Sequence, residues 1–441
     1  MRQPITADLL RSMAQTASQK GTTHDLMERA VTTNGIFATS ENNMLSATNT
    51  TVFSHEVDTG SVTDQKESGR CWLFATLNAL RHQMITDHKL ESLELSQSYS
   101  FFWDKLEKSN MFYELIIDSV EETLSGRKLS YLIEHPQVDG GWWEYSAAVI
   151  TKYGVVPKSV MPESVATSKS RQLNILLDRK LRKDALELRR LANGSGSQDE
   201  LQSRKEQMLA EVYDILTIAI GTPPQSFDFA YRDKDKNYHR DDGITPQEFL
   251  KKYGRGKIDD YVSVLNDPSP DKSYGKTYAF KDGGNMVGGP APLFLNVDMP
   301  TLKKLVRKQL EAGEAVWFGC DIGTDTTKKG YMTADAYDFD ATFSVDFGLS
   351  KAERLASRDS SVTHAVSITG VDIVQDQPRQ WKVENSWGEK VGNKGYYTMS
   401  DGWFDANGYV VAIRRDLLDP EHRKALAQTP ETIPIWDPLN G

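Results

Sequence analysis

The sequence is poor in cysteine, with Cys71 and Cys320 as the only two among 441 residues. Two thiols cannot build a disulfide framework, which excludes the small disulfide-rich secreted classes. The sequence also lacks an apolar run of about 18 residues, the length a membrane-spanning helix needs. Its first residues contain no apolar core of the signal-peptide type. We therefore expect a cytoplasmic protein with no membrane partner.

Positive charge is also scarce, because 52 Lys and Arg residues face 62 Asp and Glu residues and give a net charge of −10. An acidic protein has no general attraction to phosphate backbones, which argues against nucleic acid as a main partner. A local basic lining that binds nucleic acid stays open as an alternative. The basic run at 179–190 contains Asp184 and Glu187, as is typical of a solvated helix face.

Two motifs for metal or carboxylate chemistry are incomplete. DKDKNYHRDDGI at 233–244 has Tyr238 where a calcium loop of the EF-hand type needs glycine and Ile244 where it needs glutamate, so it predicts a polar turn. VDTGS at 57–61 matches the loop of aspartic peptidases, but those enzymes need two such carboxylates and no second copy exists. We expect no metal and no organic cofactor.

The spacing of apolar residues predicts helices in the first half of the chain. Residues 6–33 are typical of two short helices broken at Gly21. After Cys71, apolar residues recur at steps of one, three and four, which predicts a helix with one buried face that begins at the cysteine. Further helices are predicted at 96–123, 143–153, 171–193 and 198–219. The last two form a charged antiparallel hairpin that we expect to project from the main body.

From about residue 260 the pattern changes to short β-branched and aromatic runs bounded by Gly, Asp and Asn, which predict strands. These runs are YVSVL, FLNVD, AVWFGCDI, HAVSITGVDIV, QWKVENSW, GYYTM and YVVAI. The C-terminal third is therefore predicted to be a mainly antiparallel sheet, and the fold class is α+β.

A catalytic cysteine needs a base, an orienting group and an oxyanion donor, and each has a candidate. Cys71 begins a helix, whose free N–H groups are expected to lower the pKa of its thiol. His364 opens a strand, and Asn385 follows a strand end, where its amide oxygen can fix the imidazole tautomer. Gln65 precedes the cysteine and offers an amide N–H to an oxyanion, beside the backbone N–H of Cys71. Cys320, inside an apolar run, is predicted to be structural.

The order Gln, Cys-Trp, His and Asn-Ser-Trp-Gly resembles the papain-like cysteine peptidases. A set of longer segments is similar to one branch of them, that of bleomycin hydrolase and aminopeptidase C. These segments are QKESGRCWLFA, LSQSYSFFWDKLEKSN, TPQEFLKKYG, VWFGCDIG, THAVSITGVD and VENSWGEKVGNKGYY. The resemblance runs from about residue 30 to the end. It implies a papain-like two-lobed α+β fold with a helical lobe, an antiparallel barrel-like β lobe, a helical hairpin insertion and a C-terminal tail in the active-site cleft.

With this resemblance we divide the chain into five segments. They are an N-terminal helical arm at 1–60, a helical lobe with the nucleophile at 61–165, a helical insertion for oligomerisation at 166–260, a β-rich lobe with His and Asn at 261–430, and a gating tail at 431–441.

The resemblance also implies an activity. It makes Cys71 the nucleophile, His364 the general base and then acid, Asn385 the orienting group and Gln65 the oxyanion donor. The implied enzyme is a cysteine aminopeptidase that releases N-terminal residues from peptides through an acyl-enzyme.

Three further implications concern the substrate and the assembly. Gly140 and Gly141 border the substrate and let its backbone approach closely. The tail PIWDPLNG blocks the far part of the cleft, so the terminal carboxylate of Gly441 faces the free ammonium of a peptide. The family also implies a homohexamer that encloses the active sites around a central channel.

Other functions stay open from the sequence alone. Only Leu439, Asn440 and Gly441 follow Pro438, and so short a tail leaves room for dipeptide release or for endopeptidase action on the same scaffold. A cysteine acyltransferase of the transglutaminase kind uses the same nucleophile and base, usually with Asp at the position of Asn385. A non-catalytic, DNA-associated homologue is the third alternative.

Overall fold

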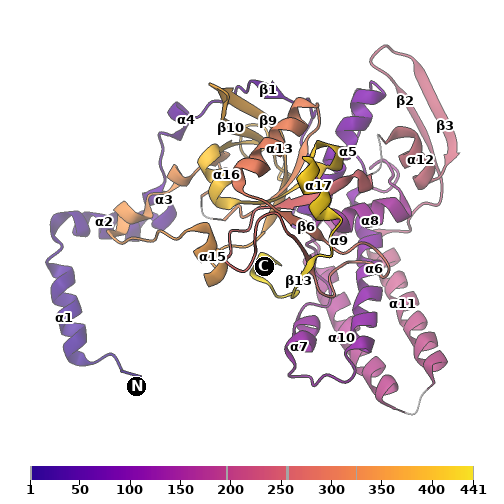
Figure 1. Ribbon diagram of the computed structural model, residues 1–441, viewed down its shortest axis with the longest axis horizontal. Helices are drawn as coiled ribbons and strands as arrows, with labels where there is room; N and C mark the ends of the chain where they lie inside the picture. The colour runs from indigo at the N-terminus through magenta and orange to yellow at the C-terminus, as the bar shows by residue number, and fades with distance from the viewer. Residues whose placement is uncertain (1, 195–196, 255–257, 324, 441) are drawn as a thin grey trace.

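The computed structural model describes residues 2–194, 197–254, 258–323 and 325–440. The chain forms an α+β fold in which a large sheet lies beside a helical part, and an N-terminal arm reaches away from both (Figure 1). Within these residues every helix falls short of the length and hydrophobicity that a membrane span requires.

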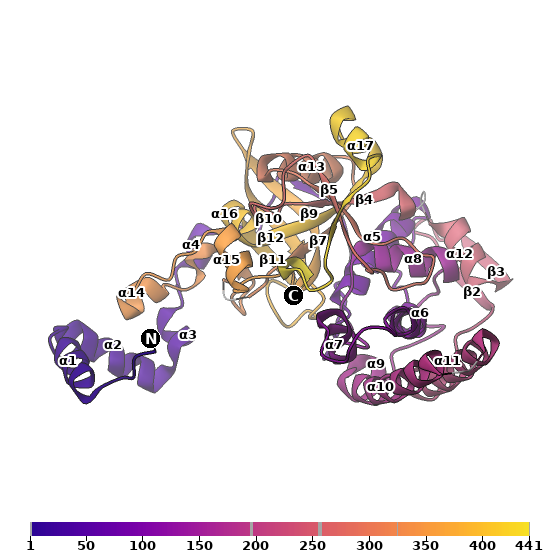
Figure 2. The same cartoon turned by 60° about the horizontal axis from the view of Figure 1, so that its bottom comes forward.

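The N-terminal arm consists of α1 (Ala7–Ser18), α2 (Gly21–Asn34), α3 (Ile36–Ser40) and α4 (Leu45–Thr48). The break between the first two helices lies where the sequence predicts it, because Gly21 has a positive φ of 75° and begins α2. Neither α1 nor α2 buries any side chain, and Leu9, Leu10 and Met13 are exposed. Figure 2 shows the arm on the far side of the sheet from the helical part.

Helix α5 (Cys71–Asp87) begins at the cysteine as predicted, but the expectation of one buried face is wrong. Polar side chains such as Thr76, Asn78 and Arg81 are buried along with the apolar ones. The reason is its central position, since α5 packs against β7 (Val316–Cys320) and β9 (His364–Val374) as well as against helices of the helical part.

The helical part is built around α6 (Gln97–Asp118). The other helices are α7 (Arg127–Glu134), α8 (Trp143–Tyr153), α9 (Val165–Ser168), α10 (Arg171–Asn193), α11 (Gln198–Ile220) and α12 (Pro246–Tyr253). The predicted hairpin exists as α10 and α11, but it does not project alone. Leu177, Leu181 and Leu188 of α10 are fully buried, because both helices pack along α6 (Figures 1 and 2).

The segment at 166–260 also contains a hairpin of β2 (Phe227–Arg232) and β3 (Tyr238–Ile244), which the sequence analysis missed. The predicted polar turn is limited to the residues between these strands. There the Asp233 carboxylate accepts from the backbone N–H of Asn237 at 2.8 Å and pairs with His239 at 2.9 Å. This carboxylate therefore stabilises the turn.

The large sheet has the strand order β13-β5-β6-β4-β12-β7-β9-β10-β11-β8, and β1 pairs with β9. Its remaining strands are β1 (His55–Glu56), β4 (Tyr261–Leu265), β5 (Thr277–Phe280), β6 (Leu293–Asn296), β8 (Tyr331–Met332), β10 (Gln377–Glu384), β11 (Tyr396–Ser400), β12 (Gly408–Arg414) and β13 (Glu431–Ile433). Most pairings are antiparallel, as predicted, and the pairs β4–β6, β5–β13 and β8–β11 are parallel.

Further helices complete the C-terminal third. They are α13 (Met299–Glu311), α14 (Phe339–Phe343), α15 (Lys351–Ser357), α16 (Asp401–Asn407) and α17 (Pro420–Leu426). Helix α14 lies against α2 and α3 of the N-terminal arm (Figure 2). Helix α13 packs on β7, β9 and β12, where it buries Leu302, Leu305 and Val306. The last described residues form a 3₁₀ turn, Pro438–Asn440, and both figures place this yellow segment between the sheet and the helical part.

Candidate active site

The sheet brings the predicted base and orienting residue together. Strands β9 and β10 pair antiparallel, so His364 at the start of β9 lies beside Asn385, which directly follows β10. His364 Nε2 is 2.9 Å from Asn385 Oδ1, and both residues are buried. The backbone N–H of Ser386 donates to the same oxygen at 2.8 Å, which identifies it as an acceptor. His364 therefore donates from Nε2, and its Nδ1 remains for a second partner.

An indole covers this hydrogen bond. The Trp387 ring lies 4.9 Å from the His364 ring, centroid to centroid, at an interplanar angle of 38°.

The nucleophile comes from a different part of the chain. Cys71 is the first residue of α5, and its thiol interacts with the backbone N–H of Ala365, the residue after His364. The start of α5 is held against β7 because Trp317 Nε1 donates to the carbonyl oxygen of Trp72 at 3.1 Å. Helix and sheet thus place the thiol next to the imidazole strand.

The expected lowering of the thiol pKa is wrong. Burial raises the pKa of Cys71 to about 11, and the backbone N–H groups of Ala365 and Trp72 offset only part of that rise. Burial also lowers the pKa of His364 to about 4, while the hydrogen bond to Asn385 raises it slightly. Burial thus disfavours the charged form of the thiol and of the imidazole alike. Moving the proton from sulfur to imidazole creates both charges together, and their attraction offsets part of the cost.

The side-chain amide of Gln65 is held by hydrogen bonds at both its oxygen and its nitrogen. Its Oε1 accepts from Ser386 Oγ at 2.6 Å, and its Nε2 donates to the carbonyl oxygen of Ser68 at 2.6 Å. An amide nitrogen carries two N–H groups, so one donor of Gln65 remains for an oxyanion. Ser386 links this side chain to Asn385, although the sequence places the two far apart.

The two predicted substrate-border glycines have different surroundings. A Cβ on Gly141 would lie 2.8 Å from the Trp72 ring, so this glycine permits tight packing beside the nucleophile. A Cβ on Gly140 would meet nothing within 4 Å, so open space lies on that side. Lys108 Nζ donates to the Gly140 carbonyl oxygen at 2.8 Å, and Trp72 Nε1 donates to that of Asp139 at 2.6 Å. These bonds fix the segment beside Cys71.

The C-terminal tail ends next to this segment. Trp142 Nε1 donates to Asn440 Oδ1 at 3.3 Å, and Asn440 Nδ2 donates to the carbonyl oxygen of Ile435 at 2.7 Å. Leu439 is fully buried, and Asp437 pairs with Lys272 at 3.1 Å. The predicted ammonium anchor, Gly441, lies outside the described residues.

Three charges near the site, two of them buried and the third half-buried, were missed from the sequence. Arg70 directly precedes Cys71, Glu384 directly precedes Asn385, and Asp139 directly precedes Gly140. Each forms an ion pair with a partner distant in sequence: Glu163, Arg81 and Lys105 respectively. Their positions within the motifs were the only signal available, because the partners are set by tertiary packing.

Metal-ligating side chains do not gather at this site. Among the described residues, the only cluster of His, Cys, Asp or Glu with suitable spacing is His24, Asp25 and Glu28, which lies in the N-terminal arm. Cys320 is fully buried in β7, opposite His364, as expected for a structural residue.

Comparison with known proteins agrees with this geometry. The model of the Peptidase C1-like family matches residues 4–440. The chain belongs to this family. Aminopeptidase C of Streptococcus thermophilus is 46% identical over 417 residues, which cover 94% of each chain. Aminopeptidase C of Lactobacillus delbrueckii subsp. lactis is 43% identical, and the match covers 100% of this chain and 99% of that protein. The crystal structure of PepW from Lactobacillus rhamnosis HN001 superposes on this Peptidase C1-like chain with a TM-score of 0.98, at 46% identity and full coverage of both.

These matches confirm the predicted family branch, the α+β papain-like fold class and the class of enzyme, a cysteine aminopeptidase.

Proposed function

We propose that Cys71 carries the reaction, with His364, Asn385 and Gln65 in the roles that the sequence suggested. The observation that carries the proposal is the thiol of Cys71 beside Ala365, next to an imidazole whose Nε2 is committed to Asn385. The Nδ1 atom of His364 takes the thiol proton as the sulfur attacks the first peptide carbonyl. It then delivers that proton to the departing amine.

The acyl-enzyme is resolved by water. His364 Nδ1 accepts a proton from the water as its oxygen attacks the thioester, and the sulfur leaves and regains a proton from the imidazolium. The free amide N–H of Gln65 and the backbone N–H of Cys71 donate to the oxyanion in both steps. The contact between Ser386 Oγ and Gln65 supports this role, because it holds the amide in one orientation.

We propose further that the enzyme acts only at free N-termini, because the C-terminal tail fills the rest of the cleft. The contact of Trp142 with Asn440 supports this, since Trp142 adjoins the glycine pair that borders the substrate. The carboxylate of Gly441 then binds the ammonium group of the substrate. A peptide with a blocked N-terminus cannot form this ion pair, and its blocking group clashes with the tail. Gly140 and Gly141 border the peptide.

We also propose that the protein forms a homohexamer and is located in the cytoplasm. A homohexamer is supported by the N-terminal arm, whose apolar side chains at Leu9, Leu10 and Met13 are exposed in the single chain. A cytoplasmic location is supported by two free cysteines, since reducing compartments preserve thiols. Light scattering and cell fractionation test these two assignments. The five-segment division, with 166–260 serving oligomerisation, is retained as part of the same proposal.

A time course with one unblocked octapeptide tests the proposed activity. Mass spectrometry should show products shortened from the N-terminus by one residue at a time, and the Cys71→Ala and His364→Ala variants should form almost none. Release of dipeptides, or fragments cut internally, would contradict the single-residue mode and would indicate the endopeptidase or dipeptide-releasing alternative.

A further inference from the structure

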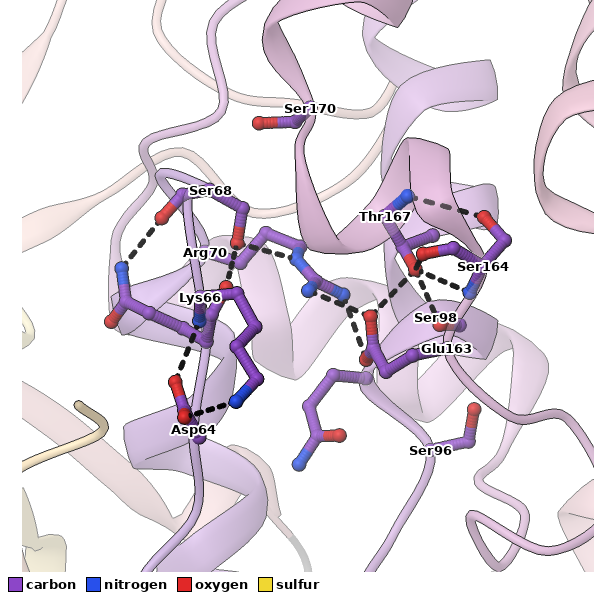
Figure 3. Close-up of polar contacts among 12 residues, drawn as sticks. Asp64, Lys66, Ser68, Arg70, Ser96, Ser98, Glu163, Ser164, Thr167 and Ser170 are labelled. Carbon is purple, nitrogen blue, oxygen red and sulfur yellow. Dashed lines mark hydrogen bonds and ion pairs between the residues drawn. The ribbon is translucent and has the colours of Figure 1, made fainter. Parts of the chain in front are cut away.

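The loop that carries Gln65 is tied to the helical part by a chain of buried polar contacts. Arg70 closes this loop, and Figure 3 shows its side chain lying between Ser68 on one side and Glu163 on the other. Arg70 Nε donates to Ser68 Oγ at 2.9 Å. The two terminal nitrogens donate to the two oxygens of Glu163, at 3.1 Å and 2.8 Å. All three nitrogens of the guanidinium are therefore used.

The Arg70 side chain is completely buried, which makes these partners necessary. Its guanidinium lies over the rings of Phe74 and Phe101, 5.2 Å and 5.3 Å from their centroids. A charge in such surroundings is tolerated only when it is paired and hydrogen-bonded. The bidentate geometry also fixes its orientation, which a lysine could not reproduce.

Glu163 is itself anchored to two helices. Its Oε2 accepts from Thr167 Oγ1 of α9 at 2.6 Å, and that hydroxyl accepts from Ser98 Oγ of α6 at 3.2 Å. Burial raises the pKa of Glu163, but its pairing with Arg70 outweighs this and keeps the pKa below the ordinary value. The carboxylate is thus a fixed, charged support for the guanidinium at neutral pH.

The other side of the chain of contacts leads to the oxyanion donor. Ser68 Oγ donates to the carbonyl oxygen of Gln65 at 2.7 Å, and Gln65 Nε2 donates to the carbonyl oxygen of Ser68 at 2.6 Å. The hydroxyl that Arg70 contacts is therefore the one that binds the Gln65 backbone. The loop needs such support, because Lys66 has a backbone φ of 56°, which residues other than glycine rarely adopt.

We infer that Arg70 is a positioning residue for catalysis: clamped by Glu163, it holds Ser68, and Ser68 holds Gln65 where the free amide N–H meets the oxyanion. The inference rests on the proposed role of Gln65 and adds the residues that determine its position. An ion pair that only stabilises the fold would have no particular link to the oxyanion.

A double-mutant cycle between Ser68 and Gln65 tests this inference. Ser68→Ala removes two hydrogen bonds without adding or removing charge. A misplaced catalytic group costs up to about 10²-fold, so we expect kcat to fall about 10-fold with KM unchanged. Gln65→Ala should lower kcat by roughly 10²–10³. The double variant should match Gln65→Ala within about twofold, because Ser68 acts through Gln65. Ser119→Ala is the matched control, since its buried hydroxyl donates only to Leu115 O.

A second readout separates positioning from general damage to the site. Alkylation of Cys71 by iodoacetamide has no oxyanion in its transition state, so Ser68→Ala should react within about twofold of the wild type. Mass spectrometry of the Cys71 peptide distinguishes it from the buried Cys320. Arg70→Lys should reproduce the loss of kcat, again without further loss in the Gln65→Ala background. If Arg70→Lys fails to fold, the Ser68 cycle decides alone.

The outcomes are distinguishable. Wild-type kcat in Ser68→Ala, or a full additional loss in the double variant, overturns the inference and leaves the role of Gln65 intact. Parallel loss of alkylation and kcat also overturns it, because the damage then lies at Cys71. Full activity in Gln65→Ala refutes the proposed oxyanion donor, and the inference fails with it.

Discussion

Glu384 links the strand that precedes Asn385 to the helix that begins with Cys71. Its replacement by glutamine is the sharpest test of how these two elements are held together. The residue lies at the end of β10, one residue before Asn385, and its carboxylate is completely buried. Three side chains of α5, the helix that begins with Cys71, converge on it. They are Asn78 at 3.1 Å, Arg81 at 3.1 Å and His82 at 3.0 Å.

The expected cost follows from the charge that remains behind. In Glu384→Gln, the buried Arg81 keeps its bonds to the carbonyl oxygens of Ser61 and Leu93 but loses its counter-ion. Breaking a buried ion pair in this way costs 3–5 kcal/mol, and the amide oxygen still accepts, so we expect about 3 kcal/mol. With a urea m-value of about 3 kcal/mol/M, the unfolding midpoint should fall by about 1 M.

Urea titration followed by tryptophan fluorescence measures this change at a fixed protein concentration. Glu389→Gln is the control, because it makes the same substitution at an exposed position four residues beyond Asn385. Peptidase activity should also fall in Glu384→Gln, since Asn385 shifts relative to α5. A midpoint within about 0.2 M of the control would refute the reasoning that this carboxylate locks helix to sheet.

Four further predictions concern the base, the tail and the metal-free chemistry. The pKa of His364 is lowered to about 4, so the base stays neutral in mild acid, and the acid limb of kcat/KM should lie near pH 4; a limb near 6.5 would contradict the burial argument. Because of the same shift, the folded state binds fewer protons than the unfolded state between about pH 6.5 and 4. His364 therefore contributes stability above about pH 6.5 that is lost as the pH falls toward 4. Acid unfolding of His364→Gln should lack this loss of stability. Deletion of Asn440 and Gly441 removes the contact with Trp142 and should allow cleavage of N-acetylated peptides; continued rejection of them would mean that the tail does not gate the cleft. Prolonged EDTA treatment should leave activity unchanged, and loss that is restored by a divalent metal would overturn the metal-free mechanism.

The sequence predicts which residues lie together better than it predicts their environment. Cys71, His364 and Asn385 were proposed because each occupies a recognisable place at the end of a helix or strand, and the fold brings them side by side. The direction of the Cys71 pKa shift was wrong, because it depends on burial that sheet and helix create together. Arg70 was passed over for the same reason, since its partner Glu163 is brought to it only by folding.

The same limit applies to the fold. Strands β4, β6, β7, β9, β10, β11 and β12 of the large sheet were predicted from β-branched and aromatic runs, whereas the short strands β1, β5, β8 and β13 were not. Strand β3 escaped because its residues, YHRDDGI, are mostly polar and largely exposed. Leu177, Leu181 and Leu188 marked α10 as helical, but they did not reveal that α6 would cover them.

The most direct test of the account compares one short peptide bearing a free N-terminus with its N-acetylated twin, using Cys71→Ala as the blank. The account predicts stepwise cleavage of the free peptide alone, because the tail leaves room only for the first residue and its ammonium. Equal cleavage of both peptides by the wild type would contradict it and would make this chain an endopeptidase on the same scaffold.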